Sequence, residues 1–203
     1  MSTAAAESNA HSLIDPGDTV LVVIDIQQSF LDKYDRAKVQ TLLSKVAWLI
    51  DIAKHLGIPV VAMAEAIEKN GTLVEPILNA LAEGTTVHNK DAFGLHDNPA
   101  ILEAVKQTGR KTVVCVGMET DVCVMHSAIG LLDHGFRVMV PRDAVATTDF
   151  DEAVGIERMR DAGVMIGSVK TVFFEWMRSV SGCGALNSAE PDLRGKRPPN
   201  LIL

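Results

Sequence analysis

The 203-residue sequence has little of several features that define other classes of protein. Aromatic residues make up 4% of it, so aliphatic side chains must form most of any core. Its three cysteines are an odd number, and too few for a scaffold held together by disulfides. The hydrophobic share is nevertheless 47%, which excludes a wholly disordered chain.

Positive charge and long apolar runs are also scarce. Nineteen Lys and Arg against 26 Asp and Glu give a net charge of −7, and no dense basic run is present. Nucleic acid is therefore not an expected partner, because neutralising phosphates requires basic surface. No apolar stretch reaches the ~18 residues of a membrane span. The first 12 residues lack the basic and apolar regions of a secretory signal, so we expect a cytoplasmic protein with no membrane partner.

Short apolar runs alternate with segments of helical periodicity along most of the chain. Six runs rich in β-branched residues predict strands, at 19–24, 58–64, 85–89, 111–116, 136–140 and 164–167. Helices are expected between and after them, at 39–53, 73–82, 98–109, 121–134, 151–162 and 169–180. This alternation predicts right-handed βαβ units in a three-layer α/β/α sandwich with a central, mostly parallel six-stranded sheet.

The length suits one α/β domain carrying extensions. We expect the domain at 18–180, an N-terminal arm at 1–17 that ends in a turn-forming Asp-Pro-Gly, and a C-terminal arm at 181–203. The second arm begins with a Gly-rich segment around Cys183. That cysteine is expected to be mobile and outside the fold.

Three chemically capable residues fall at the ends of predicted strands. Asp25 ends the first strand, Lys90 ends the third, and Cys123 lies in the turn after the fourth. Taken singly, they could be a helix cap, a solvated lysine and a core thiol. In folds of this class, however, ligands bind beyond the carboxyl ends of the strands. A carboxylate, an ammonium and a thiol on that edge could serve as base, charge stabiliser and nucleophile.

Cys123 has the most distinctive local setting of the three cysteines. It is expected in the first turn of a helix, where unpaired N–H groups and the helix dipole favour a thiolate. A nearby Lys90 would lower the thiol pKa further, and the same N–H groups could form an oxyanion hole. Cys115 lies inside a predicted strand, so we expect an inert core thiol there.

Three segments carry a resemblance to a known family. VVIDIQQSF at 22–30, NKDAF at 89–93 and GMETDVCV at 117–124 resemble, in order and spacing, the motifs of the isochorismatase-like cysteine hydrolases. The resemblance covers roughly residues 18–179. It implies a catalytic triad of Asp25, Lys90 and Cys123.

The resemblance also implies a mechanism. Asp25 would accept the thiol proton, Cys123 would attack a carbonyl carbon, and Lys90 would stabilise both charges. A cis peptide is implied between Met118 and Glu119. It would turn the backbone N–H groups of Glu119 and Cys123 toward one oxyanion.

Differences from other members of the family narrow the range of expected substrates. Isochorismatases proper, which cleave a vinyl ether, are similar in fold but lack the nucleophilic cysteine, so its presence favours the C–N bond of a small amide or carbamoyl compound. Nicotinamidases carry an Asp/His metal cluster after the second strand, whereas residues 64–70 contain no histidine. The Gly-x-Glu-Thr form of 117–120 also resembles a metal-free subgroup. We therefore expect no metal and no cofactor.

The resemblance also bears on assembly. Because family members commonly form oligomers, it implies a homo-oligomer: a dimer, tetramer or larger assembly.

Other roles near the triad stay open. Phe30, Tyr34, Glu65 and Phe93 are candidates for lining a substrate pocket, because they flank the triad in the expected strand-end loops. Glu119 could be structural or could face the substrate. Two alternative functions remain for the whole chain. One is a catalytically silent oligomeric binding protein, and the other is a thiol redox sensor, which would need a resolving cysteine near Cys123.

Overall fold

The computed structural model describes residues 13–148 and 152–203. Within them, seven strands form one sheet in the order β3-β2-β1-β4-β5-β7, with β6 beside β4. The strands are β1 Thr19–Ile24, β2 Val60–Glu65, β3 Val87–Lys90, β4 Thr112–Met118, β5 Arg137–Pro141, β6 Val145–Ala146 and β7 Met165–Gly167. Their pairings are parallel, as predicted. The expected number of six strands was wrong, because the two-residue β6 is too short to give a sequence pattern.

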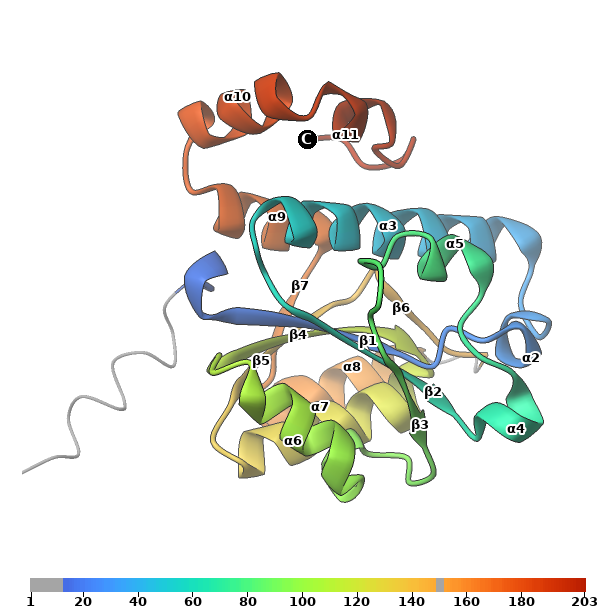
Figure 1. Cartoon of the computed structure of the whole chain (residues 1–203). Coiled ribbons are helices and arrows are strands. Elements are labelled where there is room, and N and C mark those ends of the chain that lie inside the picture. The colour runs from blue at the N-terminus through green and yellow to red at the C-terminus, as the bar shows by residue number, and fades with distance from the viewer. Residues whose placement is uncertain (1–12, 149–151) are drawn as a thin grey trace, which may run out of the picture.

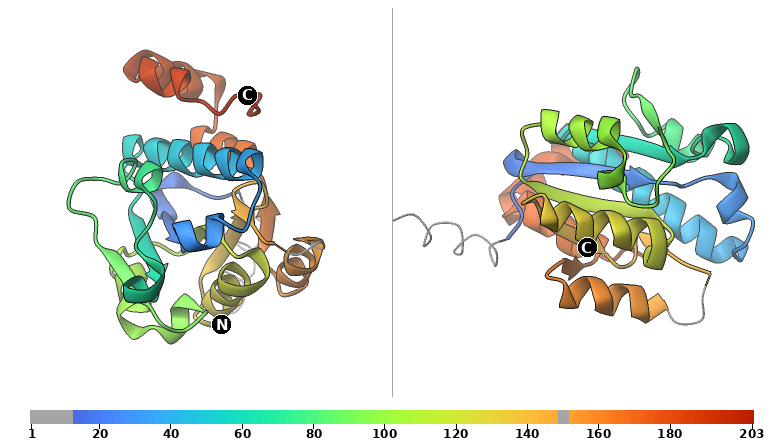
Figure 2. Two further views of the ribbon diagram at one scale, coloured as in Figure 1. Left: turned by 90° about the vertical axis from the view of Figure 1, so that its right-hand side faces the viewer. Right: turned by 90° about the horizontal axis from the view of Figure 1, so that it is seen from below.

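Helices cover both faces of the sheet and complete the expected α/β/α sandwich (Figures 1 and 2). The α-helices are α2 Gln28–Leu31, α3 Arg36–His55, α4 Ile67–Asn70, α5 Glu75–Leu78, α6 Pro99–Gln107, α7 Met125–Asp133, α8 Glu152–Asp161, α9 Val169–Met177, α10 Val180–Ala189 and α11 Pro191–Gly195. Three short helices of other types are the 3₁₀-helices η1 Pro16–Asp18 and η2 Leu95–Asp97 and the π-helix η3 Thr120–Val124. Across the described residues, no helix is both long and apolar enough to cross a membrane.

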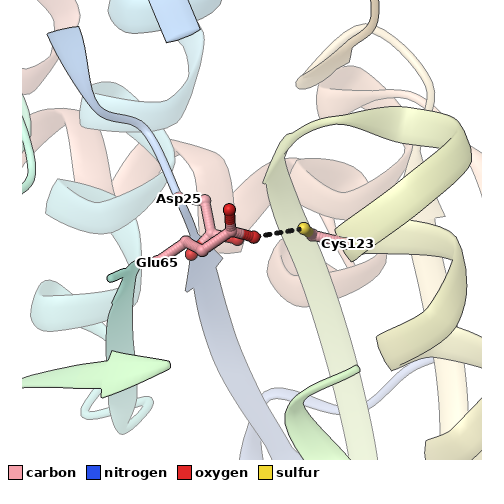
Figure 3. Close-up of side chains that lie close together, drawn as sticks. All are labelled: Asp25, Glu65 and Cys123. Carbon is pink, nitrogen blue, oxygen red and sulfur yellow. Dashed lines mark hydrogen bonds between the residues drawn. The ribbon is translucent and has the colours of Figure 1, made fainter. Parts of the chain in front are cut away.

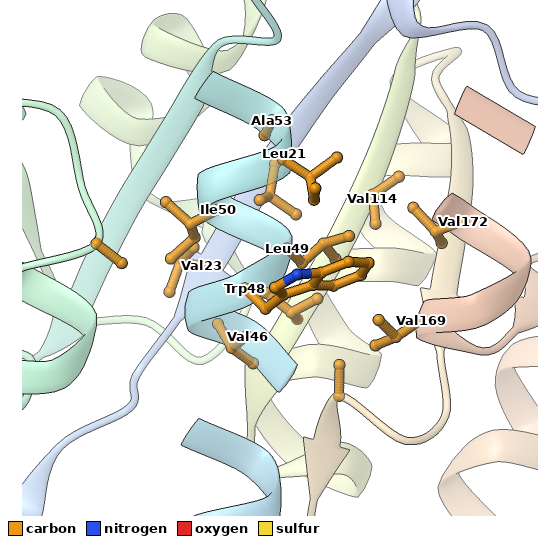
Figure 4. Packing of buried hydrophobic residues seen from close by; sticks show 14 of the residues in the cluster. Leu21, Val23, Val46, Trp48, Leu49, Ile50, Ala53, Val114, Val169 and Val172 are labelled. Atoms are coloured by element: carbon orange, nitrogen blue, oxygen red, sulfur yellow. The ribbon is translucent and has the colours of Figure 1, made fainter. Parts of the chain in front are cut away.

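The sheet separates two hydrophobic layers. All six residues of β1 are buried, with alternate side chains pointing to opposite faces. Leu21 and Val23 pack toward α3 and α9 around Trp48, among mainly aliphatic side chains (Figure 4). Val20 and Val22 pack toward α6, α7 and α8. Burial on both faces explains why this strand appears in the sequence as an uninterrupted apolar run.

The C-terminal segment is part of the fold, which corrects the expectation that Cys183 lies outside it. Helices α10 and α11 lie over α3 and α9 (Figure 1). Leu186 and Leu193 are buried in the cluster around Trp48, and the Trp48 indole N–H donates to the Leu193 carbonyl at 3.0 Å. Cys183 is partly buried against the same cluster. The leucines of this segment are scattered among small residues, so the sequence shows no clear helical period there.

The N-terminal arm and the helix expected at 73–82 also differ in detail from expectation. Residues 1–12 of the arm lie outside the described residues, as does the start of the helix expected at 151–162. Ile14 is fully buried, and its N–H donates to Glu175 at 2.7 Å. The helix expected at 73–82 is observed only as α5, and Leu73, at its expected start, forms a β-bridge with Gln27 instead.

A glycine lets β4 pass close to the end of β1. Gly117 pairs with Ile24 and has a φ of 126°, a backbone conformation that disfavours other residues. A Cβ at this position would collide with the carbonyl oxygen of Ile24. The close approach fixes the loop after β4 directly beside Asp25.

Candidate active site

Adjacent strand ends bring four polar side chains to one edge of the sheet. Asp25 follows β1, Glu65 ends β2, and Lys90 ends β3 in register with Glu65. Cys123 enters from η3, which follows β4. Figure 3 shows Asp25, Glu65 and Cys123 pointing toward one another. Parallel strands place their carboxyl ends at the same edge, which is why residues far apart in sequence meet here.

The Lys90 ammonium occupies the centre of this cluster. Its Nζ lies 3.0 Å from Asp25 Oδ2, 3.2 Å from Glu65 Oε2 and 3.5 Å from Cys123 Sγ. It also donates to the Ala92 carbonyl at 3.0 Å. The Lys90 and Asp25 side chains are both fully buried. A buried ammonium requires such paired and hydrogen-bonded surroundings, so Lys90 supplies the positive charge that lets two carboxylates share the site.

Cys123 lies in a setting that differs from the one expected. It is the fourth residue of the five-residue π-helix η3, not part of the first turn of an α-helix. Its side chain is almost wholly buried, and the thiol donates to Glu65 Oε2 at 3.3 Å (Figure 3). π-helical turns of this kind often occur at functional sites, where they redirect a side chain.

The thiol is not pre-ionised, which corrects the expected lowering of its pKa. Burial raises the pKa of Cys123 above its ordinary value of 9.0, and the Asp25 and Glu65 carboxylates raise it further. Lys90 acts in the opposite direction without overcoming these effects. At neutral pH, Cys123 is therefore a thiol that must lose a proton before or during attack.

The other ionisable groups have complementary properties. Burial raises the pKa of Asp25 to about 6, although Lys90 favours the carboxylate. Burial disfavours the charged form of Lys90, but the Asp25 carboxylate, with smaller contributions from Glu65 and from Cys123 in its thiolate form, outweighs burial and raises the pKa of Lys90 overall. Asp25 is consequently mostly ionised at neutral pH and Lys90 stays charged. Burial raises the pKa of Cys115 to about 12, as suits a thiol inside β4.

The loop before Cys123 has an unusual backbone. The peptide bond between Met118 and Glu119 is cis. The Glu119 carbonyl accepts hydrogen bonds from the N–H groups of Val122 at 3.2 Å and Val124 at 3.1 Å. Its side chain forms an ion pair with Lys33 at 3.7 Å. These contacts hold the Glu119 backbone at the start of η3.

The four candidate pocket residues have different surroundings. Glu65 belongs to the polar cluster itself. Phe30 and Tyr34 are half-buried in the segment after β1, where the ammonium groups of Lys33 and Lys38 lie over their rings at 4.8 and 5.4 Å. Phe93 follows β3, is 54% exposed, and meets the ring of His126 edge-on at 6.1 Å. Substrate contact by the three aromatic side chains stays a prediction.

Gln27 has a structural role at the site that sequence reasoning missed. Its fully buried amide accepts a hydrogen bond from the Glu65 N–H at 2.8 Å and donates to the Glu65 carbonyl at 2.9 Å. The same amide nitrogen donates to the Gly71 carbonyl. These bonds fasten the end of β2 to the segment after β1. In the sequence, the only sign of this role is that Gln27 is a polar residue close to the end of a predicted buried strand.

The site also contains groups that can bind cations. Ligand atoms of Asp25, Glu65 and Cys123 all lie within 4.8 Å of one another in the described part of the chain. The Lys90 ammonium lies 3.0 to 3.5 Å from all three of these ligand atoms. It therefore occupies the position that a bound cation would need. The absence of a metal requirement stays a prediction.

The parallel α/β/α sheet, with a thiol, an ammonium and a carboxylate at one edge, has the arrangement expected from the three sequence motifs. A family model described as the isochorismatase domain matches residues 19–171. The chain therefore belongs to the isochorismatase family of hydrolases, and the resemblance drawn from the motifs is confirmed.

Individual relatives support this placement. The chain is 30% identical over 164 residues to a secreted isochorismatase effector of Phytophthora sojae, covering 79% of this chain and 77% of the relative. The YcaC gene product of Escherichia coli, described as an octameric hydrolase of unknown specificity, is 26% identical with a TM-score of 0.79, covering 91% and 94% of the two chains. N-carbamoylsarcosine amidase from Thermoplasma acidophilum shares the fold at 22% identity, with a TM-score of 0.64 and coverage of 75% and 96%.

Proposed function

We propose that this chain hydrolyses the C–N bond of a small amide or carbamoyl compound through a covalent adduct on Cys123. The contact of the Lys90 ammonium with Asp25 at 3.0 Å and with Cys123 at 3.5 Å carries this proposal. It joins a base, a charge stabiliser and a nucleophile in one buried cluster. The shared fold with N-carbamoylsarcosine amidase supports a C–N substrate.

In the first half of the proposed reaction, Cys123 Sγ bonds to the carbonyl carbon while its proton passes to Asp25. The raised thiol pKa makes a base necessary, and Asp25, with a pKa of about 6, is available as a carboxylate at neutral pH. The backbone N–H groups of Glu119 and Cys123 would stabilise the oxyanion. Lys90 keeps its charge throughout and offsets the negative charge that develops on sulfur and oxygen.

The tetrahedral adduct then collapses. The C–N bond breaks, and the leaving nitrogen takes the proton held by Asp25, so ammonia or an amine departs neutral. A thioester or thiocarbamate remains on Cys123. Water hydrolyses it to release the second product and to restore the thiol.

The two alternative functions have less support. A redox sensor needs a second thiol near Cys123, whereas Cys115 is fully buried inside β4 and Cys183 lies in α10 beyond the opposite helical layer. A silent binding protein has no chemical need for an ammonium enclosed by two carboxylates and a thiol. For the assembly, we propose a homo-oligomer, a dimer, tetramer or larger, because the Escherichia coli YcaC structure is described as octameric. The cytoplasmic location stays a prediction from the sequence.

The proposal is tested with a panel of small primary amides, ureas and carbamoyl amino acids, with ammonia release as the readout. We expect release by the wild-type protein, loss by at least about 10³-fold in Cys123→Ser, and no change in the control Cys183→Ser. The control removes a thiol far from the strand ends. Ammonia release that survives Cys123→Ser would rule out the covalent mechanism.

A further inference from the structure

We propose that Glu65 is a further catalytic residue, the general base that activates the water which releases the acyl group from Cys123. This inference rests on the proposed function of the site, since it concerns the second half of the same reaction. It assigns different tasks to the two carboxylates that surround Lys90.

The two carboxylates differ in their access to solvent. The side chain of Asp25 is fully buried, whereas that of Glu65 is 19% exposed. Glu65 nevertheless reaches the reacting atoms, because its Oε2 lies 3.3 Å from Cys123 Sγ and 3.2 Å from Lys90 Nζ. A water entering from solvent therefore meets Glu65 before it meets Asp25.

Acylation changes what Glu65 can bind. In the resting site, the Cys123 thiol donates a hydrogen bond to Glu65 Oε2 at 3.3 Å. An acylated sulfur carries no proton, so this oxygen loses a donor at the moment when a water must be deprotonated. Water can take the place of the thiol on Oε2, close to the acyl carbon, which is bonded to the same sulfur. A general base must be within hydrogen-bond reach of the proton it removes.

The proposed step balances in atoms and charge. The water oxygen forms a bond to the acyl carbon while one water proton passes to Glu65. The C–S bond breaks, and the Cys123 thiolate takes that proton back from Glu65. The products are a carboxylic or carbamic acid and the resting thiol, with Glu65 again a carboxylate. Lys90 remains in contact with both groups and stabilises the departing thiolate.

Hydrogen bonds to its backbone hold Glu65 beside Lys90 and Cys123. Gln27 hydrogen-bonds both the N–H and the carbonyl of Glu65, at 2.8 and 2.9 Å, and the Asn70 side chain donates to the same carbonyl at 3.2 Å. The register of β2 with β3 places Glu65 beside Lys90. Glu65 thus belongs to a fixed strand end, and catalytic groups on such elements are positioned more accurately than groups on loops.

The test uses 4-nitrophenyl acetate, because nitrophenolate release reports acylation and the steady state reports release of the acetyl group. Glu65→Gln keeps the shape of the side chain and removes its basicity. We expect a burst of nitrophenolate at near the wild-type rate, followed by turnover slowed about 10²-fold, as for loss of a general base. Intact-protein mass spectrometry should then show acetylated Cys123 accumulating. The control is Glu68→Gln, an exposed glutamate three residues further on, which should behave as wild type.

Other outcomes overturn the assignment. If the burst and the steady state slow in proportion, with no accumulated acetyl group, Glu65 acts in acylation or in positioning Lys90. Unchanged turnover would equally contradict the role. If Glu65→Gln does not fold, Glu65→Asp retains the charge with a shorter reach and should still accumulate some acetyl-Cys123; its absence would overturn the proposal. Turnover at the wild-type rate in Cys123→Ser, or wild-type turnover with no acetyl group on Cys123 at any time, would instead refute the proposed function itself.

Discussion

The Lys90 ammonium lies 3.0 Å from the Asp25 carboxylate, and neither side chain is exposed to solvent. Together with Glu65, 3.2 Å from the same nitrogen, they form a charge cluster in which each member compensates another. Such clusters are sensitive to the removal of one partner, since the remaining charges stay buried without compensation. The stability and the pH dependence of this protein should therefore both depend on this pair.

Replacing Lys90 should destabilise the fold. Lys90→Met keeps much of the side-chain volume but leaves two carboxylates facing each other without a cation. We expect the free energy of unfolding, measured by urea denaturation at pH 7.5, to fall by about 3–5 kcal/mol. Lys69→Met, an exposed lysine on α4, is the control and should change little. Equal unfolding midpoints for the two variants would show that Lys90 does not compensate the charges of the Asp25 and Glu65 carboxylates.

The reaction should depend on the ionisation of Asp25. Because burial raises the pKa of Asp25 to about 6, its carboxyl group becomes protonated below that pH and can no longer accept the thiol proton. We expect kcat/KM for an active amide to rise as pH increases through about 6 and then to level off. A profile that is flat between pH 5 and 7.5 would argue against Asp25 as the base.

The free energy of unfolding, unlike the reaction rate, should fall as pH rises through this range. The pKa of Asp25 is about 6 in the folded protein and near 3.8 when unfolded, so the folded state binds more protons between these values. The contribution of Asp25 to stability is therefore fully present below about pH 4 and is lost as pH rises through 6. We expect Asp25→Asn to remove this component from the pH dependence of urea unfolding. If Asp25→Asn and the wild-type protein show the same difference in stability between pH 4 and 6.5, Asp25 does not cause that difference.

Gln27 should support both the fold and the position of Glu65. Gln27→Ala leaves the Glu65 N–H and carbonyl without the amide that now pairs with them. We expect a loss of about 1–3 kcal/mol in the free energy of unfolding. Gln28→Ala is the control, because Gln28 is exposed and its side-chain amide donates to the exposed Asp32 carboxylate. A Gln27→Ala variant as stable as this control would show that the buried amide contributes little.

Sequence reasoning identified the edge of the site but not its full chemistry. Asp25, Lys90 and Cys123 were recognisable because buried strands have a clear apolar pattern and the motifs mark where they end. Glu65 was assigned only to the pocket, because its contact with Lys90 depends on the register between β2 and β3. The direction of the Cys123 pKa shift was wrong for a similar reason, since burial and a second carboxylate act only in the folded chain.

The close packing of β1 and β4 gives a further prediction. Gly117→Ala would place a Cβ against the Ile24 carbonyl at a φ of 126° and should cost at least about 2 kcal/mol, by both overlap and backbone strain. Gly184→Ala, in α10 with open space around it, should be neutral or slightly stabilising. Thermal denaturation of the two variants distinguishes them. A Gly117→Ala variant with wild-type stability would mean that the strand ends can separate freely.

The central claim is that Cys123 forms a covalent bond to its substrate. The most direct measurement is rapid acid quenching of the wild-type protein during turnover of an active amide, followed by peptide mapping by mass spectrometry. We expect an acyl or carbamoyl group on Cys123 that forms and decays at rates consistent with kcat. Neither Cys115 nor Cys183 should carry it. Turnover with no modification of Cys123 at any quench time, using a method that detects a chemically acylated standard of the same peptide, would show that Cys123 is not a covalent nucleophile.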